Sequence, residues 1–331
     1  MRVYRGMYHS ILHEKERDPV LAEIREFVRG VFQRMVDHSA LAHADSQGYT
    51  NEEYAWLHAG LPMISLRRLG YRLQRMLMKT LGSLSDGIAL GWRAGFDSGQ
   101  SLDYVYRNSP QGKLGIGRIL DKNYLNSAGW CGIRQRKVHM ERLLREAIAQ
   151  TQKDYSQPVS IVDFAGGPGR YVLDVVKEMP QDSYKVLIRD WSEEGLDQGR
   201  RIAKELGLSG IEYRRGDAFS KESLAEIGQV DIAIVSGLYE LFSSNEMICR
   251  SLQGIAACVK PGGYLIYTGQ PWHPQLEMIA EVLINRDGKP WVMRRRTQAE
   301  MDELVRAQGF TKLRMELDNE QIFTVSLAQR L

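Results

Sequence analysis

The chain has 331 residues, of which 43% are hydrophobic and 26% are charged, and its formal net charge is +3. These values are typical of a soluble globular protein with one domain of about 150–200 residues and an appended segment. The small net charge gives no reason to expect a nucleic-acid partner, and without a run of about 18 apolar residues no transmembrane helix is expected.

The first half of the chain, residues 1–154, is predicted to be helical. Apolar residues recur at helical spacing after Asp18-Pro19, and a second helix is expected over residues 63–81. A third is expected from about Ile133 to Gln150, and we interpret the whole segment as a cap over an acceptor site. The apolar residues that define the first two helices are Leu21, Ile24, Val28, Val31 and Met35, then Leu66, Leu69, Leu73, Met76 and Leu77.

Two basic stretches each allow two interpretations. The side of helix 63–81 that carries Arg68, Arg72, Arg75 and Lys79 could lie on an anionic membrane surface, or it could be an ordinary solvated face. The run Arg294-Arg295-Arg296 could attract an acidic substrate or simply face solvent. Neither stretch resembles a nucleic-acid module, so no nucleic-acid partner is expected.

Short apolar segments alternate with helical ones from residue 155 onward. Five of them (VSIVDFA, YKVLIRD, IEYRRGD, VDIAIVSG and GGYLIYTG) are rich in β-branched or aromatic residues, and this alternation predicts a mostly parallel sheet with helices on both faces. The last two, TKLRMELD and QIFTVSLAQ, predict an antiparallel hairpin at a sheet edge. Residues 155–331 are therefore predicted to form a doubly wound α/β domain with a seven-stranded sheet.

A glycine turn, VDFAGGPGRYVLDV (residues 162–175), follows the first predicted strand. Gly166, Gly167 and Gly169 lack Cβ atoms, so the backbone can turn sharply and approach a ligand closely. Ligands of open α/β sheets bind beyond the carboxyl ends of the strands, where this turn lies. Such turns also occur where nothing binds, so the turn alone does not decide the function.

Two aspartates at the ends of the next strands favour a bound adenosine. Asp190 could accept the ribose hydroxyls, and Asp217 could accept from the adenine amino group. Either could instead cap the next helix, but their positions on consecutive strands are better explained together. The dinucleotide pattern G-x-G-x-x-G requires a glycine where Val172 stands, which disfavours a pyrophosphate.

The order of these motifs resembles the class I S-adenosylmethionine-dependent methyltransferases over residues 155–331. Asp163-x-Ala165-x-Gly167-x-Gly169 resembles their first motif, although Ala165 stands where the family usually has its first glycine. Asp190 and Asp217 match the family's ribose- and adenine-binding acids. The resemblance implies S-adenosylmethionine as the cofactor, bound by Asp163, Ala165, Gly166, Gly167, Gly169, Asp190, Trp191, Asp217, Ala218 and Ser236.

A second set of stretches is similar to a narrower bacterial methyltransferase family. These are NSAGWCGIRQRKVHMERLL, SGLYELF, YTGQPWHPQLEMIA and WVMRRRTQAEMDELV, and the similarity extends back to about residue 60. Members of that family often occur fused behind an α/β-hydrolase domain, so a hydrolase partner is expected by analogy. No G-x-S-x-G nucleophile elbow is found in this chain.

Methyl transfer from a sulfonium is an in-line displacement, so the protein must mainly align the acceptor and remove its proton. No metal site is expected, because three widely spaced cysteines and no ligand cluster are present, and this cysteine usage fits a reducing, cytoplasmic setting. His273 is predicted to be the general base because its pKa should lie near the working pH. Glu240 could be a base or an anchor. Each could instead have a local structural role.

The remaining candidates would bind the acceptor or the cofactor. Tyr239 and Trp272 could form an aromatic wall, or they could be ordinary core residues. Arg134 could pair with the methionine carboxylate of the cofactor or form a surface salt bridge. Acceptor contacts are predicted for Tyr124, Tyr239, Gln270, Trp272 and His273.

The sequence thus predicts metal-free methyl transfer to a small-molecule or lipid-like acceptor. Two alternatives stay open: a non-catalytic or regulatory module that binds the cofactor, and an NAD(P)-dependent oxidoreductase.

Overall fold

The computed structural model describes residues 4, 6–7, 10, 12–15, 17–33, 38–154 and 157–331. Their contacts define two compact units, Met1–Ala40 and Leu41–Leu331. The first unit contains helix α1 (Arg17–Gln33), which confirms the helix predicted after Asp18-Pro19. Met35 lies outside the described residues, and α1 exposes Ile24, Val28 and Val31.

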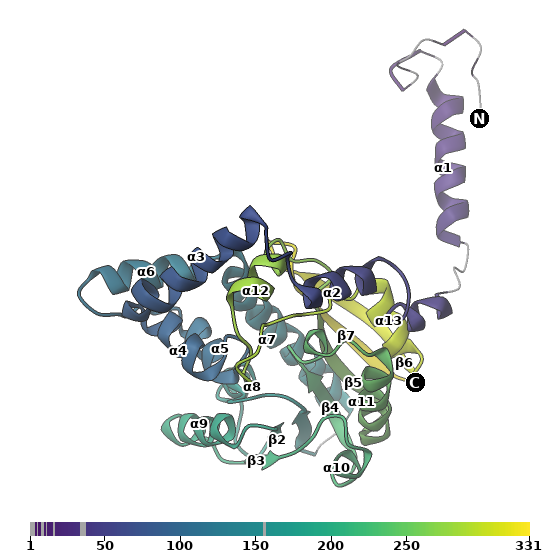
Figure 1. The fold of residues 1–331 in the computed structure, drawn as a ribbon. Coiled ribbons are helices and arrows are strands. Elements are labelled where there is room, and N and C mark those ends of the chain that lie inside the picture. Colours follow the sequence, from purple (N-terminus) through teal and green to yellow (C-terminus); the bar gives the residue numbers. More distant parts are fainter. Residues whose placement is uncertain are drawn as a thin grey trace. The chain divides into compact units, whose positions relative to one another are not determined.

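The second unit is built around a seven-stranded sheet of order β3-β2-β1-β4-β5-β7-β6 (Figure 1). The first five strands in this order are parallel, and β7 is antiparallel to both of its neighbours. The predicted doubly wound fold and its C-terminal hairpin are therefore confirmed. The strands are β1 (Val159–Asp163), β2 (Tyr184–Asp190), β3 (Ile211–Arg215), β4 (Val230–Val235), β5 (Val259–Gly269), β6 (Phe310–Leu317) and β7 (Thr324–Arg330).

Both faces of the sheet are covered because successive strand residues point to opposite sides. Ile161 belongs to one apolar cluster and its neighbour Val162 to another, and Ile266 and Leu265 divide in the same way. Helix α7 (Ala128–Asp154), which precedes β1, and helices from the connections between strands close both clusters. They are α7, α8 (Arg170–Val176) and α9 (Glu193–Glu205) on the first cluster, with α10 (Lys221–Ala225), α11 (Asn245–Cys258) and α13 (Gln298–Arg306) around the second.

A third apolar cluster joins the helices before residue 128 to α12 (Leu276–Val282) and to Ile322 and Phe323. The contacts therefore place the division of the chain at residues 40 and 41, and the helices up to residue 154 belong to the same unit as the sheet. These helices are α2 (Tyr49–Ala59), α3 (Leu66–Thr80), α4 (Asp86–Ala94), α5 (Gly99–Arg107) and α6 (Ile116–Leu125), with single 3₁₀ turns at η1 (Ser39–His43) and η2 (Leu81–Leu84).

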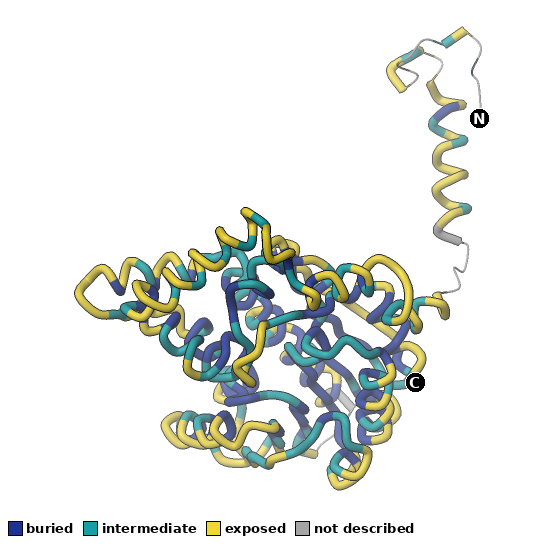
Figure 2. Tube along the Cα trace, in the orientation of Figure 1, coloured by how far each residue is buried: buried dark blue, intermediate teal, exposed yellow. Residues whose placement is uncertain are grey.

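Helix α3 lies in an orientation that its sequence did not predict. Arg68 and Arg75 are half-buried: Arg68 donates to the Leu61 carbonyl, and Arg75 lies over the ring of Trp92. The interpretation of the basic side as a solvated face is therefore wrong for these two arginines. The apolar side of α3 is the exposed one, and Figure 2 shows α3 and α6 mostly exposed, in contrast to the buried sheet. Within the described ranges, no helix is both long and apolar enough to cross a membrane.

Candidate active site

The glycine turn borders a cavity of about 460 Å³ at the carboxyl ends of the parallel strands, here called the glycine-turn cavity. Gly169 has a left-handed φ of 71°, and a Cβ atom at this position would lie 2.2 Å from Ile188 Cδ1. A side chain is excluded on both grounds, which explains the glycine. Seven predicted cofactor residues line this cavity: Ala165, Gly166, Gly167, Gly169, Asp190, Trp191 and Ser236.

Two carboxylates hold the turn in shape. Asp190 accepts hydrogen bonds from the backbone N–H groups of Gly167 at 2.9 Å and Ser192 at 2.8 Å. Asp163 lies fully buried beneath the turn, and burial raises its pKa to about 7. The Tyr171 hydroxyl donates to Asp163 Oδ2, whereas Oδ1 has no hydrogen-bond partner among the described residues. Asp163 does not line the cavity, so this oxygen is enclosed beneath the turn.

Apart from Asp163, three predicted cofactor residues do not line the glycine-turn cavity. Asp217 accepts from the N–H of Phe219 at 2.8 Å within its own turn, and Ala218 packs in the core. Arg134 donates to the Leu125 carbonyl at 2.6 Å. Arg136 lines the cavity instead, because helix positions two apart do not share a face.

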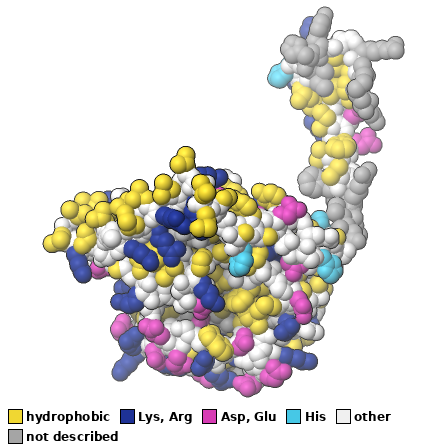
Figure 3. Space-filling view, in the orientation of Figure 1, with side chains coloured by type: hydrophobic (Ala, Val, Ile, Leu, Met, Phe, Trp, Pro, Cys, Tyr) yellow, Lys and Arg dark blue, Asp and Glu magenta, His cyan; other side chains and the backbone are white. Residues whose placement is uncertain are grey.

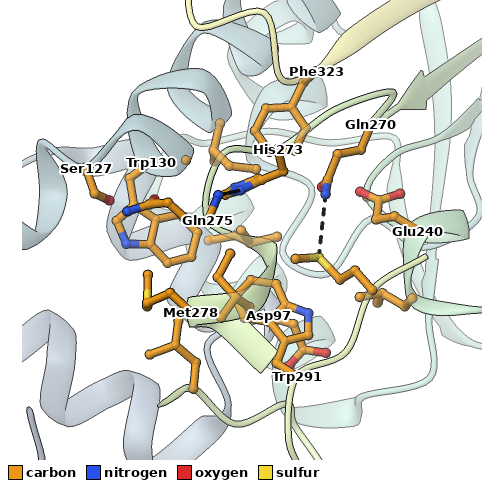
Figure 4. A pocket seen from close by; sticks show the side chains of 18 of the residues that line it. Asp97, Ser127, Trp130, Glu240, Gln270, His273, Gln275, Met278, Trp291 and Phe323 are labelled. Atoms are coloured by element: carbon orange, nitrogen blue, oxygen red, sulfur yellow. Dashed lines mark hydrogen bonds between the residues drawn. The ribbon is translucent and has the colours of Figure 1, made fainter. Parts of the chain in front are cut away.

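A second cavity, of about 240 Å³, lies against the ends of β4 and β5, and we call it the aromatic cavity. Trp130 stacks on Trp291 with ring centroids 6.4 Å apart, and Tyr124 meets Trp130 edge-on at 5.6 Å. In Figure 4, Gln270 and Glu240 lie on the side opposite Trp130 and Met278. Four predicted residues are thus brought together here, namely Tyr124, Glu240, Gln270 and His273.

The predicted aromatic wall of Tyr239 and Trp272 lines neither of these two cavities. Tyr239 is buried in the core beneath the sheet end, where its hydroxyl lies 3.0 Å from Ser251 Oγ. Trp272 is exposed on the loop after β5. The wall is formed instead by aromatic residues from α6, from α7 and from the segments that follow α12 and β6. The last two segments contribute Trp291 and Phe323, which were not predicted to be site residues.

His273 does not have the pKa that the sequence argument assumed. Burial lowers its pKa to about 4, so the imidazole is neutral near pH 7. Its Nδ1 accepts a hydrogen bond from the Gln275 N–H at 3.0 Å, which leaves the proton on Nε2. In this state His273 is suited to donating a hydrogen bond rather than to removing a proton.

The stability of the protein should therefore depend on pH through His273. Between pH 6.5 and pH 4 the unfolded chain binds a proton here that the folded chain does not, so stability is lost as the pH falls through this window. The loss should total about 3 kcal/mol, and His273→Asn should remove it. Urea unfolding of both proteins at several pH values measures the difference; parallel stability curves would contradict the assignment.

Four residues line both cavities: Asp97, Leu102, Arg136 and Gly237. Arg136 is buried, and its Nη1 lies 3.5 Å from Glu240 Oε1. Asp97 is buried as well, and it accepts from the N–H of Arg286 at 2.6 Å and from its Nε at 3.2 Å. The two cavities therefore adjoin at a pair of buried charges, neither of which the sequence had singled out.

The Arg294-Arg295-Arg296 run neither lines the two cavities nor faces solvent. Arg294 is buried and donates twice to Glu300 Oε1, at 2.8 and 2.9 Å. Arg296 donates to the carbonyls of Tyr239 and Phe242, at 2.6 and 2.7 Å. Burial lowers the pKa of Arg296 to about 10. The solvent-facing interpretation is thus wrong for Arg294 and Arg296, and Arg296 fixes the 3₁₀ turn η3 (Tyr239–Leu241), which carries Glu240.

Residues 24–330 match a protein family described as "Putative methyltransferase". The chain belongs to this methyltransferase family. A curated relative from Escherichia coli strain K12, named "Uncharacterized protein YnbC", is 46% identical over 328 residues, which are 98% of this chain. The match covers 56% of that relative, so the chain spans little more than half of its length.

Solved structures share the fold. A Bordetella parapertussis protein, described as a possible exported protein, superposes with a TM-score of 0.58 and 17% identity over 87% of this chain and 96% of its own. Magnesium protoporphyrin IX methyltransferase from Synechocystis, solved with bound S-adenosylhomocysteine, gives a TM-score of 0.47 and 15% identity over 79% of this chain and 99% of its own. At such identities the likeness concerns the fold alone.

Proposed function

We propose that this protein transfers a methyl group from S-adenosylmethionine to an apolar, lipid-like small-molecule acceptor. The observation that carries the proposal is the adjoining pair of cavities, one walled by the glycine turn and Asp190, the other by aromatic and methionine side chains. Membership in a methyltransferase family supports the reaction type. When bound, the cofactor supplies an activated methyl group on a sulfonium.

The glycine-turn cavity has the groups that this cofactor requires. The Asp190 carboxylate is held at the edge of the cavity, where it can accept from ribose hydroxyls. Arg136 can pair with a carboxylate, the role first predicted for Arg134. The adenine-binding role of Asp217 stays a prediction, as does the α/β-hydrolase partner.

The aromatic cavity determines which acceptors fit. Its walls are mainly apolar, with few polar groups, as in most small-molecule sites. Glu240 is the candidate for receiving the acceptor's proton, because its carboxylate lines the cavity beside the junction with the glycine-turn cavity. Neutral His273 would orient the acceptor by donating from Nε2. Helices α3 to α6 act as the cap, since residues of all four contribute to the lining of the cavities.

Glu240→Gln should separate chemistry from cofactor binding. Turnover should fall by about 10²- to 10⁴-fold, because the proton acceptor is lost, while the affinity for S-adenosylhomocysteine stays within about threefold. The measurements are transfer of tritiated methyl groups into a bacterial lipid extract and isothermal titration. Binding of NADH without S-adenosylhomocysteine would overturn the cofactor assignment. Full turnover by the variant would remove Glu240 from its role.

A further inference from the structure

The outer side of α3 is apolar and open to solvent. Ile64, just before the helix, is fully exposed, and Leu66 and Leu69 are 89% and 63% exposed. The same side continues through Leu73, Met76, Leu77 and Leu81. The inner side, which carries Arg68, Tyr71, Arg75 and Met78 at helical spacing, packs on the protein. Monomeric soluble proteins rarely expose so many large apolar side chains together, so this side requires an explanation.

Helix α6 and the loop before it extend the apolar surface. Leu114 is 85% exposed, and Ile116 and Ile119 are also exposed. Both α3 and α6 contact the turn η2, and Figure 3 shows a band of hydrophobic side chains over both helices. Leu114 also has a left-handed φ of 57°, which is uncommon for a residue with a bulky side chain. The loop thus holds an apolar side chain outward despite an unfavourable backbone conformation.

The charges within the two segments that form this surface are all of one sign, although Arg67 is paired with Glu277 of α12. Residues 62–85 and 107–120 contain eight lysines and arginines and no aspartate or glutamate, in a chain that has 44 basic and 41 acidic residues. Arg72, Lys79, Lys113 and Arg118 are exposed, and Figure 3 shows basic side chains beside the apolar band. Apolar side chains flanked by cations are suited to the interface of an anionic bilayer.

The aromatic cavity reaches the surface beside this face. Gln74 and Met78 of α3 line it, and Gln74 is the one lining residue among those described that is exposed. We infer that α3, α6 and the loop between α5 and α6, with their exposed side chains, form a docking face for an anionic lipid surface. Docking would place the cavity opening at the lipid, so that an apolar acceptor enters directly. This last step rests on the proposed function, whereas docking itself does not.

Vesicle sedimentation with the full chain tests the docking face. We expect binding to vesicles that contain phosphatidylglycerol and little binding to pure phosphatidylcholine, with weaker binding as salt is added. The triple variant Leu69→Gln/Leu73→Gln/Ile116→Gln should lower the affinity by at least about tenfold, because the inserted apolar area is lost. The triple variant Arg72→Gln/Lys79→Gln/Arg118→Gln should lower the affinity by a similar factor, and only for the vesicles that contain phosphatidylglycerol.

Matched controls change equivalent side chains elsewhere. Leu313→Gln, on the exposed strand β6, and Arg201→Gln/Lys204→Gln, on α9, should bind vesicles as the wild type does. Wild-type protein that binds neither vesicle, or an apolar variant that binds as tightly as wild type, would overturn the inference. A wild type that is dimeric in solution, together with an apolar variant that is monomeric, would also overturn the inference, because a second copy of the chain would then cover the face. All of these measurements are made without the cofactor, so a negative result would contradict the docking face and leave the proposed function untouched.

Discussion

Asp190→Ala should weaken the binding of S-adenosylhomocysteine by about ten- to a hundredfold. The carboxylate fixes the N–H groups of Gly167 and Ser192, and in the proposed complex it also accepts from the ribose. Hydrogen bonds to a charged group contribute about 1.5–3 kcal/mol each, and a factor of ten in affinity corresponds to about 1.4 kcal/mol. Isothermal titration of the wild type and the variant measures the change.

The control for this prediction removes a carboxylate that has no place in the cavity. Asp182 lies exposed in the turn before β2, and Asp182→Ala should leave the affinity within about twofold. Thermal unfolding of Asp190→Ala in the absence of ligand shows whether the glycine turn still folds. An affinity for Asp190→Ala within twofold of wild type would refute the ribose role.

Arg294→Met should lower the free energy of unfolding by about 3–5 kcal/mol. Arg294 and Glu300 are both almost completely buried, and their ion pair is reinforced by Asn245 at 3.3 Å and Thr50 at 3.1 Å. The variant leaves a buried carboxylate that keeps a hydrogen bond from the Asn245 amide at 2.8 Å and a weaker ionic contact with Arg296 at 3.8 Å. Breaking a buried pair from one side is strongly destabilising for this reason. Urea unfolding at pH 7 measures the loss.

Two further variants test this explanation. Replacing both partners, in Arg294→Met/Glu300→Leu, should recover part of the lost stability, because the Glu300 carboxylate is no longer buried without Arg294, while Arg296 keeps its carbonyl acceptors but loses its contact with Glu300. Arg295→Met should cost less than Arg294→Met, because the side chains of Arg295 and Glu53 are 14% and 21% exposed and water screens their attraction. Equal losses for Arg294→Met and Arg295→Met would show that burial of the pair does not set the cost.

Local patterns were sufficient to predict the sheet and the glycine turn. Strand and helix periodicities extend over a few residues, and the position of Asp190 follows from the end of one strand. The antiparallel hairpin was predictable because only a short polar turn separates its two apolar segments. In each case the information lies within one or two adjacent elements, so no knowledge of distant contacts was needed.

The rest of the site depends on contacts between distant segments. The wall of the aromatic cavity combines Trp130 with Trp291 and Phe323, which lie more than 160 residues further along the chain. The choice of Arg136 over Arg134 follows from the rotation of α7 against the sheet. The low pKa of His273 follows from its burial. An amphipathic pattern defined two sides of α3, but which side is covered depends on the neighbours that pack against it.

Asp97 and Arg136 face both cavities, and this arrangement has a thermodynamic consequence. A molecule in either cavity would alter the surroundings of the same two buried charges, so we expect the two binding equilibria to be coupled. Linkage makes such coupling reciprocal: the factor by which one ligand changes the affinity of the second equals the factor by which the second changes the affinity of the first. Inhibitors of the aromatic cavity should therefore be screened with the other cavity filled, because their affinity for the empty protein measures a different state.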